Sequence, residues 1–217
     1  MPTQKELVQY LKAQSAPSAS TIDKLKIAYR PLICPFDDLL EILPEKSSVF
    51  DIGCGSGMFL ALVKQFKSPE RLGGIEISDQ LIENAKFVLG EENEQNVYLD
   101  TFDGKEIPDE IKSYDYVFMI DVFHHIPKVD QLDFLSQLFE KLKTGAVLVF
   151  KDIEGGSIFK YWNKVHDLLL AGEIGNEISS RKLKSFLDAI KHIEVIDFNK
   201  RQMFLYPHFT YLIKKIS

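Results

Sequence analysis

The chain alternates short apolar runs with longer segments in which apolar residues recur every three or four positions. The apolar runs predict five strands, at residues 48–52, 72–77, 97–99, 114–120 and 146–150. Helical spacing predicts the segments between them as helices, at residues 58–66, 80–89 and 130–142. Strands that alternate with helices are typical of a mostly parallel sheet covered by helices.

After residue 150, the sequence predicts a different connection, because the last two strands are not joined by a helix. After a polar turn at residues 151–157, helices are expected at 158–170 and from Ser179 or Ser180 to 190. Strands follow at 193–198 and 209–213. The link between them holds Pro207 and is too short for a helical crossover, so they should be antiparallel neighbours. The expected fold is therefore a three-layer α/β Rossmann-like fold with a seven-stranded, mostly parallel sheet and an antiparallel last strand.

Short helices precede the first strand, at residues 4–13, 21–29 and 36–42. They are too small to form a domain of their own. They either pack on the sheet or cover a site, and the sequence leaves both open. We expect one domain over residues 1–217, with residues 1–45 as an N-terminal helical cap or lid.

Composition excludes some classes of function. The chain has 217 residues, 45% of them hydrophobic and 27% charged, which argues against disorder. Its formal net charge is -6, and no stretch gathers Lys and Arg into a block. Affinity for nucleic acid comes mainly from cations that neutralise phosphates, so a small-molecule partner is expected rather than a nucleic acid.

The N-terminal residues contain no continuous apolar segment of the signal-peptide kind, and no later run is long enough to span a membrane. The two cysteines, Cys34 and Cys54, are expected to be thiols in a reducing compartment rather than a disulfide. A cytoplasmic protein is the expectation. The oligomeric state stays open.

A glycine-rich turn at residues 53–57 separates the first strand from the next helix. Glycine permits positive φ there and lets a ligand lie against bare backbone, while the first amides of the helix are available to donate. The spacing is G-x-G-x-G, not the G-x-G-x-x-G of a dinucleotide site. Asp51 would repel a diphosphate; it suits a ligand with an ammonium group, or it holds the turn by accepting backbone amides.

Glu76 ends the second strand, near the distance at which such folds place a ribose-binding acid. A carboxylate accepts hydrogen bonds from both ribose hydroxyls. An isolated Glu at a strand end is more simply a solvated charge, but beside this glycine turn the ribose interpretation is favoured.

Three ordered motifs carry a family resemblance: D-I-G-C-G-S-G at residues 51–57, G-I-E-I-S at 74–78, and Y-D-Y-V-F-M-I-D-V-F-H-H-I at 114–126. With the terminal reversed hairpin, they make residues 48–216 resemble the class I S-adenosylmethionine-dependent methyltransferases. The resemblance implies S-adenosylmethionine as the cofactor.

The resemblance also implies where the cofactor contacts the chain. The methionine part would lie on Gly53, Gly55 and the turn backbone, which includes Cys54, with Asp51 close by. The ribose and adenine would contact Glu76 and Ile77. An acid after the third strand would receive the adenine amino group; Asp103 matches that place and Asp100 is its rival. Asp121 and Val122, after the fourth strand, would border the methionine end.

Methyl transfer is an in-line attack on an activated carbon, so positioning lowers most of the barrier. A general base is needed only if the acceptor must lose a proton. His125 and His124 follow the fourth strand at the carboxyl edge of the sheet and are candidate bases. The alternative is that an imidazole braces the loop before Pro127.

Further candidates lie after the fifth strand. Lys151 and Asp152 emerge from the same edge. Asn163 and His166 share a helix face and are interpreted as cavity lining, with a solvated edge as the alternative, and His166 is a third catalytic candidate. In the terminal hairpin, Tyr206 and His208 are further candidates or packed turn residues.

The fourth-strand motif lacks the N/D-P-P-Y pattern of many nucleic-acid methylases, and no metal-ligand spacing is present, so no metal is expected. The sequence thus predicts an S-adenosylmethionine-dependent methyltransferase with a small-molecule acceptor. A non-catalytic protein that binds S-adenosylmethionine or S-adenosylhomocysteine is the alternative, and an NAD-dependent oxidoreductase is a more distant one. Neither the acceptor nor the atom methylated is specified.

Overall fold

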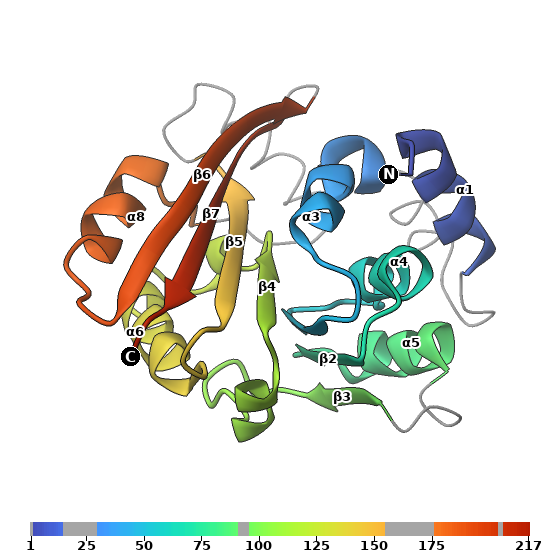
Figure 1. The fold of residues 1–217 in the computed structure, drawn as a ribbon, viewed down its shortest axis with the longest axis horizontal. Coiled ribbons are helices and arrows are strands. Elements are labelled where there is room, and N and C mark those ends of the chain that lie inside the picture. The colour runs from blue at the N-terminus through green and yellow to red at the C-terminus, as the bar shows by residue number, and fades with distance from the viewer. Residues whose placement is uncertain (1, 15–29, 91–95, 155–175, 204–205) are drawn as a thin grey trace. The chain divides into compact units, whose positions relative to one another are not determined.

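The computed structural model of the chain describes residues 2–14, 30–90, 96–154, 176–203 and 206–217 (Figure 1). By their internal contacts, the residues divide into two compact units, 1–116 and 117–217. Each unit is described by itself below. The assignment of residues 1–217 to one domain, and of 1–45 to a cap, stays a prediction.

The first unit contains three parallel strands and the helices that cover them (Figure 1). The strands are β1 (Ser48–Ile52), β2 (Arg71–Glu76) and β3 (Val97–Thr101), and the helices that contact them are α4 (Met58–Lys67) and α5 (Asp79–Leu89). Every residue of β1 is buried. Ser78 caps helix α5, and its side chain accepts a hydrogen bond from the backbone amide of Leu81.

The N-terminal helices that the structure describes pack on helix α4. They are α1 (Gln4–Ala13) and α3 (Phe36–Ile42), with the bounds that the sequence predicts. Helix α1 begins with a capping box between Thr3 and Glu6. Helix α3 contributes Phe36, which stacks on Phe59 of α4. The predicted helix at 21–29 lies outside the described residues.

Two adjacent glycines allow β2 to sit close to its neighbours. Successive strand residues point to opposite faces. On one face, a Cβ at Gly73 would come within 2.5 Å of the rings of Phe50 and Tyr114; on the other, a Cβ at Gly74 would lie 2.9 Å from the sulfur of Cys54. Real Cβ contacts are not so short. Packing on both faces of β2, the strand that ends at Glu76, therefore requires glycine at both positions.

In its described residues, the second unit contains the remaining strands and two α-helices (Figure 1). They are β4 (Tyr116–Ile120), α6 (Gln131–Lys141), β5 (Val147–Ile153), α8 (Ser180–Leu187), β6 (Ile193–Met203) and β7 (Tyr206–Lys215), with a 3-10 turn at Phe123–His125. Strand β7 pairs antiparallel with both β5 and β6, as the short link between the last two strands predicts. The predicted helix at 158–170 lies outside the described residues.

The seven strands form one sheet in the order β3-β2-β1-β4-β5-β7-β6. The sheet is mostly parallel, and its last strand, β7, runs antiparallel between β5 and β6. The predicted three-layer α/β architecture is confirmed. Within the described parts of the chain, no helix combines the length and apolar character needed to cross a membrane.

The predicted boundaries of the last three strands are wrong. Strand β5 continues through Ile153, whereas a polar turn was expected from residue 151. Lys151 and Asp152 are polar in the sequence but buried in the structure, because each has a partner of opposite charge or hydrogen-bonding capacity. The last two strands are also longer than predicted. Pro207 belongs to β7 rather than to the link, one residue after the strand begins, where a missing backbone amide is tolerated.

Candidate active site

The glycine corner follows directly from β1. Gly53, Gly55 and Gly57 have φ of 72°, 55° and 74°, values that side chains other than glycine adopt at a cost. The backbone amides of Gly53 and Cys54 donate to the carbonyl of Ile75 on β2, which closes the turn against the neighbouring strand. A Cβ built on Gly55 meets no atom within 4 Å. The corner therefore presents bare backbone to open space, as the spacing of the glycines predicts.

Glu76 is held by backbone amides on both of its oxygens. Its Oε2 accepts from the amide of Gly55 at 3.1 Å, and its Oε1 accepts from the amides of Ile77 and Ser78 at 2.8 and 3.2 Å. The side chain is thus part of the glycine corner rather than a charge directed only to solvent. A carboxylate oxygen has two lone pairs, so Oε2, with one amide, retains capacity for a ligand hydroxyl.

Asp51 places a buried acid at the same corner. Its side chain is 3% exposed, and Oδ1 has no hydrogen-bond partner. Burial raises the pKa of the Asp51 carboxyl well above its usual range, the negative charge of Glu76 raises it further, and Arg30 opposes both effects. An acid with one unpartnered oxygen beside bare backbone is suited to a cationic ligand group, and such a group would supply the missing partner of that oxygen.

We expect Asp51→Asn to stabilise the ligand-free protein. Because the folded pKa is raised above the reference value of 3.8, the cost of burying the carboxylate is small at acid pH and grows as the pH rises from about 4 through the folded pKa. The neutral amide removes that cost. The free energy of unfolding at pH 8 should rise by about 1–3 kcal/mol.

Urea unfolding of Asp51→Asn and wild type across pH 4 to 8 measures this difference. The difference in the free energy of unfolding between the two proteins should become smaller toward acid pH. A gap that is constant with pH, or a less stable variant at pH 8, would contradict the assignment of a buried, unpartnered charge.

Cys54 fills the space beneath the corner rather than facing a ligand. It is 6% exposed, and its sulfur packs against Gly74. Burial raises the pKa of the thiol well above its usual range, and the charges of Asp51 and Glu76 add to the effect. The thiol therefore stays protonated and unreactive. Its backbone, and not its side chain, belongs to the candidate site.

The residues after β2 and β3 come together beside Glu76. The side chain of Ile77 is 68% exposed, and a Cβ on Gly104 would lie 4.0 Å from its Cγ2. The amide of Phe102 donates to the carbonyl of Glu76 at 2.9 Å. An exposed apolar side chain between an acid and a neighbouring turn offers a surface to a flat ring.

Of the two rival acids, Asp103 follows β3 and adjoins Gly104 of that surface, whereas Asp100 lies within β3. Asp103 is exposed, and its Oδ1 accepts from the amides of Lys105 and Glu106, which lowers its pKa. Asp100 is occupied locally, accepting from the amide of Thr101 and from the hydroxyl of Tyr98. Both acids thus accept local hydrogen bonds, and the choice of Asp103 over Asp100 as the adenine contact stays a prediction.

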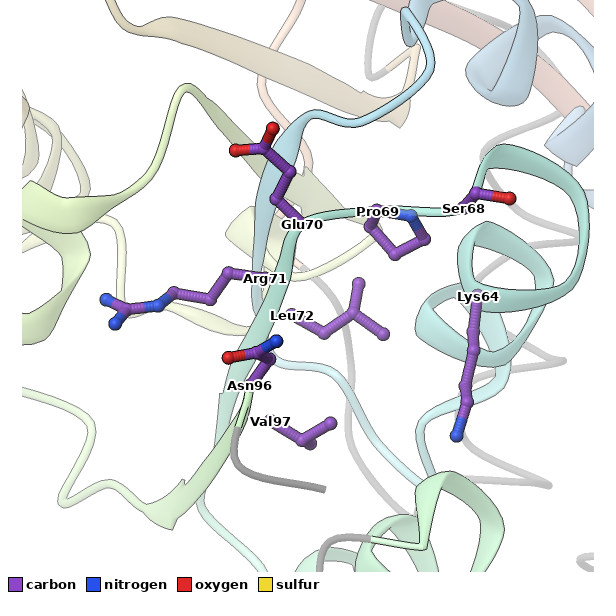
Figure 2. A pocket seen from close by; sticks show the side chains of 8 residues that line it. All are labelled: Lys64, Ser68, Pro69, Glu70, Arg71, Leu72, Asn96 and Val97. Atoms are coloured by element: carbon purple, nitrogen blue, oxygen red, sulfur yellow. The ribbon is translucent and has the colours of Figure 1, made fainter.

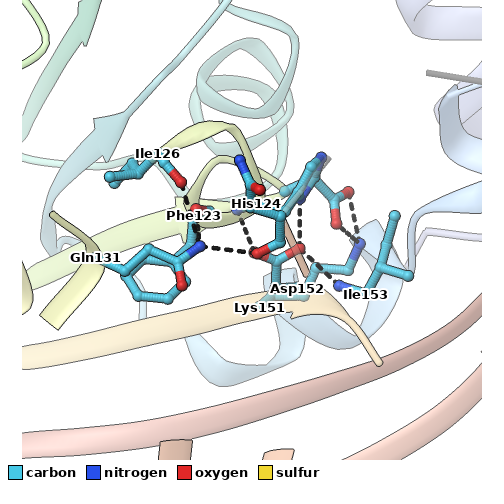
Figure 3. Close-up of polar contacts among 9 residues, drawn as sticks. Phe123, His124, Ile126, Gln131, Lys151, Asp152 and Ile153 are labelled. Atoms are coloured by element: carbon cyan, nitrogen blue, oxygen red, sulfur yellow. Dashed lines mark hydrogen bonds and ion pairs between the residues drawn. The ribbon is translucent and has the colours of Figure 1, made fainter. Parts of the chain in front are cut away.

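In the second unit, an ion pair joins the ends of β4 and β5 (Figure 3). The Nζ of Lys151 donates to both carboxylate oxygens of Asp121 at 2.6 Å, and the two side chains are 0% and 7% exposed. Asp121 has a φ of 55°, in the left-handed region that side chains other than those of asparagine and aspartate seldom adopt. Strain of this kind persists where surrounding contacts hold it, and it clusters at functional sites.

A second buried pair lies at the same two strand ends. The Nδ1 of His124 is 2.6 Å from Oδ1 of Asp152, and both side chains are almost fully buried (Figure 3). The backbone amide of His124 donates to the other carboxylate oxygen at 3.1 Å. His125 is exposed, and its ring centroid lies 4.2 Å from that of His124. The two candidate bases thus occupy different environments.

A buried glutamine that the sequence did not single out holds this loop. The Nε2 of Gln131 lies within 3.3 Å of three carbonyl oxygens, those of Phe123, Ile126 and Asn176 (Figure 3). The amide of Asn176 in turn donates to the carbonyl of His124 at 2.6 Å. Gln131 stands at the first position of α6, where nothing in the spacing marks it, so only the tertiary structure identifies it.

The other candidates have varied positions. Val122 precedes the 3-10 turn and is partly buried. His208 is buried in β7, where it is paired in register with Ile153. His166, Asn163 and the side chain of Tyr206 lie outside the described residues. In the part of the chain that is described, no three His, Cys, Asp or Glu side chains gather to hold a metal ion.

A hollow of about 200 Å³ lies away from these groups. Its lining includes Arg71 and Leu72 at the start of β2, and Asn96 and Val97 at the start of β3 (Figure 2). The glycine corner and Glu76 stand at the opposite, carboxyl ends of the strands, where open α/β sheets bind ligands. No predicted site residue lines this hollow.

Sequence comparisons show which known proteins this chain is similar to. A family model described as a methyltransferase domain matches residues 26–190. The chain is 28% identical over 155 residues to a tRNA (guanine-N(7)-)-methyltransferase of Prochlorococcus marinus, across 62% of this chain and 73% of that protein. The same enzyme of a second strain is 28% identical over 142 residues, across 59% and 66% of the two chains.

Solved structures show the same fold. A SAM dependent methyltransferase from Aquifex aeolicus has a TM-score of 0.65 at 19% identity, covering 89% of this chain and 96% of that one. Magnesium protoporphyrin IX methyltransferase from Synechocystis, with bound SAH, has a TM-score of 0.66 at 15% identity, covering 95% and 93%.

Proposed function

We propose that this chain, which belongs to the methyltransferase-domain family, methylates a small-molecule acceptor. It is a class I, S-adenosylmethionine-dependent methyltransferase, with the sheet of that class and S-adenosylmethionine as its methyl donor. The observation that supports the cofactor is the corner after β1, where the open side of Gly55 lies beside the amide-bound carboxylate of Glu76.

The residues of the first unit fit the cofactor chemically. The backbone of Gly53, Cys54 and Gly55 would hold the methionine part, whose ammonium group suits the unpartnered oxygen of Asp51. Oε2 of Glu76 would accept from a ribose hydroxyl. Two more assignments complete the set: Ile77 would lie against the adenine ring, and Asp103 would accept from its amino group.

The groups that follow β4 and β5 are the candidates for the transfer step. S-adenosylmethionine supplies a methyl group already activated by a positively charged sulfur. The protein therefore has to align the acceptor and, where the acceptor carries a proton, to remove it. Asp121 and Val122, at the end of β4, would border the methionine end, and the histidines of the following turn are the candidate bases. His166 stays a further candidate in the segment after β5.

The charge of the chain supports a small acceptor. Nucleic acid affinity depends on lysine and arginine side chains that neutralise phosphates. This chain has a formal net charge of -6. The similarity to tRNA (guanine-N(7)-)-methyltransferases supports a second candidate, methylation of a guanine base in tRNA. We favour the small molecule because the charge opposes tRNA binding.

Methyl transfer from radiolabelled S-adenosylmethionine separates these candidates. One reaction contains a nuclease-treated, deproteinised cell extract as the source of small molecules, and the other contains unmodified tRNA transcripts. We expect label in the small-molecule fraction and S-adenosylhomocysteine as the product. Label in N7 of tRNA guanine would replace the proposal with the second candidate. Cofactor binding with no transfer in either reaction would favour a non-catalytic binding protein.

Glu76→Ala should weaken the binding of S-adenosylmethionine by about 10- to 100-fold, because charge-assisted hydrogen bonds to the ribose are lost. Isothermal titration measures the affinity, and thermal unfolding reports the fold. Glu110→Ala is the matched control, since Glu110 is an exposed acid of the same unit that pairs with Arg71. Equal affinity in Glu76→Ala and wild type would return Glu76 to the role of a structural acid that only binds backbone amides.

A further inference from the structure

Strand β6 is the last strand of the sheet in the described part of the chain, so one of its edges faces away from the other strands (Figure 1). Most of its residues are exposed, and they include two large apolar side chains, Ile196 and Phe198. An exposed strand edge presents a row of amide and carbonyl groups with which a further strand can pair. The edge of β6 is therefore a candidate interaction surface.

The backbone groups of every second residue of β6 point outward from this edge. The carbonyl of Pro207 on β7 accepts from the amide of Glu154, which follows β5, so the backbone of Pro207 faces β5. In register with Pro207 on β6 is Gln202, whose own amide and carbonyl therefore point away from β7. Antiparallel pairing alternates from residue to residue, so the backbone groups of Phe198 and Lys200 point away as well.

The side chains on this edge are complementary to those of a reversed copy of the same strand. The segment 197–201 begins with an acid, Asp197, and ends with a base, Arg201. Two copies that run antiparallel about a twofold axis at Asn199 place Asp197 of each copy opposite Arg201 of the other. In the same register, Phe198 lies opposite Lys200, and the outward backbone groups of these two residues exchange hydrogen bonds.

We propose that β6 pairs with β6 of a second copy of this chain, which forms a symmetric dimer with a continuous sheet. The proposal goes beyond the methyl transfer and does not depend on it. Two neighbouring registers, with the axis at Phe198 or at Lys200, keep the outward hydrogen bonds but place no acid opposite a base. The charges therefore select the register centred on Asn199.

Two features limit the strength of this pairing. A bulge between Val195 and Asp197 interrupts the ladder just before the segment 197–201, and Oδ1 of Asp197 accepts from the outward amide of Phe198 at 2.8 Å. In the dimer, that amide donates to a carbonyl of Lys200, and the carboxylate of Asp197 pairs with Arg201 of the other copy. Because one contact replaces another and the paired segment is short, we expect a reversible dimer with a Kd in the micromolar range.

Two variants of opposite charge give the sharpest test. Asp197→Arg places base opposite base at both ends of the paired segment, and Arg201→Asp places acid opposite acid. Each variant alone should dimerise about 10- to 100-fold more weakly than wild type. An equimolar mixture of the two should form a heterodimer with about the wild-type affinity, because both facing pairs then have opposite charges. Sedimentation equilibrium over a range of protein concentrations measures these affinities.

Glu194→Arg is the matched control for charge. Glu194 is an exposed acid of β6 that lies outside the segment 197–201, so this variant makes the same change in net charge without altering a facing pair. It should dimerise like wild type and should not prefer Arg201→Asp as its partner. Wild-type protein that stays monomeric at the highest concentration would overturn the proposal. So would a mixture of Asp197→Arg and Arg201→Asp that associates no more strongly than either variant alone.

A second pair of variants tests the backbone hydrogen bonds. Lys200→Pro removes an amide that faces away from β7, a position at which an edge strand tolerates proline, so the sheet should stay intact. Lys200→Ala is its control, because both variants lose the contact with Glu154 and only proline also loses the amide. Lys200→Pro should dimerise at least about 10-fold more weakly than Lys200→Ala, with a similar thermal unfolding transition. Equal dimerisation of the two would overturn the strand pairing.

Discussion

Gly55→Val is expected to abolish the binding of S-adenosylmethionine. At Gly55 the space that a side chain would enter contains no protein atom within 4 Å, and the neighbouring carboxylate of Glu76 is fixed by the amide of Gly55 itself. The two methyl groups of valine would fill the volume that we assign to the cofactor. The affinity measured by isothermal titration should fall by at least about 100-fold, equivalent to about 2.7 kcal/mol.

Backbone strain is separated from steric exclusion by a pair of alanine variants. Gly55 has a φ of 55° and Gly90 a φ of 70°, and a Cβ on either meets no atom within 4 Å. Gly55→Ala and Gly90→Ala should therefore lose similar stability, about 1 kcal/mol each. Only Gly55→Ala should lose affinity, because Gly90 caps the end of α5. If both variants bind the cofactor equally well, the open space at Gly55 is not its binding site.

The sequence predicts the glycine corner and its neighbouring acid well because both are specified locally. The glycine corner is specified by residues 53–57, and the acid that binds it ends the next strand along the chain. Parallel pairing of β1 with β2 brings the two together: Ile52 is in register with Ile75, the residue before Glu76. A short motif and a standard crossover are thus enough to predict that Glu76 lies beside the glycines.

The paired groups at the ends of β4 and β5 depend on partners that spacing does not reveal. Asp121 and Lys151 are 30 residues apart, and His124 and Asp152 are 28 apart. In the sequence, Lys151 and Asp152 resemble the start of a polar turn. Only the pairing partners make their burial favourable, and those partners belong to another strand end. The same reason explains why Gln131 was missed: its three carbonyl contacts come from two loops.

Lys151→Met should be among the most destabilising single substitutions in the second unit. It leaves the carboxylate of Asp121, whose side chain is 7% exposed, without the ammonium that contacts both of its oxygens. Methionine retains much of the volume of lysine, so the loss is chiefly electrostatic. Breaking one partner of a buried pair typically costs about 3–5 kcal/mol, and we expect that decrease in the free energy of unfolding measured in urea.

A double-mutant cycle tests whether the loss of stability in Lys151→Met comes from the charge left on Asp121. Asparagine tolerates the left-handed backbone of Asp121, so Asp121→Asn removes the charge with little added strain. The combined variant Lys151→Met with Asp121→Asn should be more stable than Lys151→Met alone, because no unpaired charge remains. Lys184→Met is the surface control: its pair with Asp188 is more than half exposed and should be worth less than about 1 kcal/mol. If Lys151→Met costs no more than Lys184→Met, the Asp121–Lys151 pair does not hold the two strand ends together, and the strained turn after β4 must be fixed by other contacts.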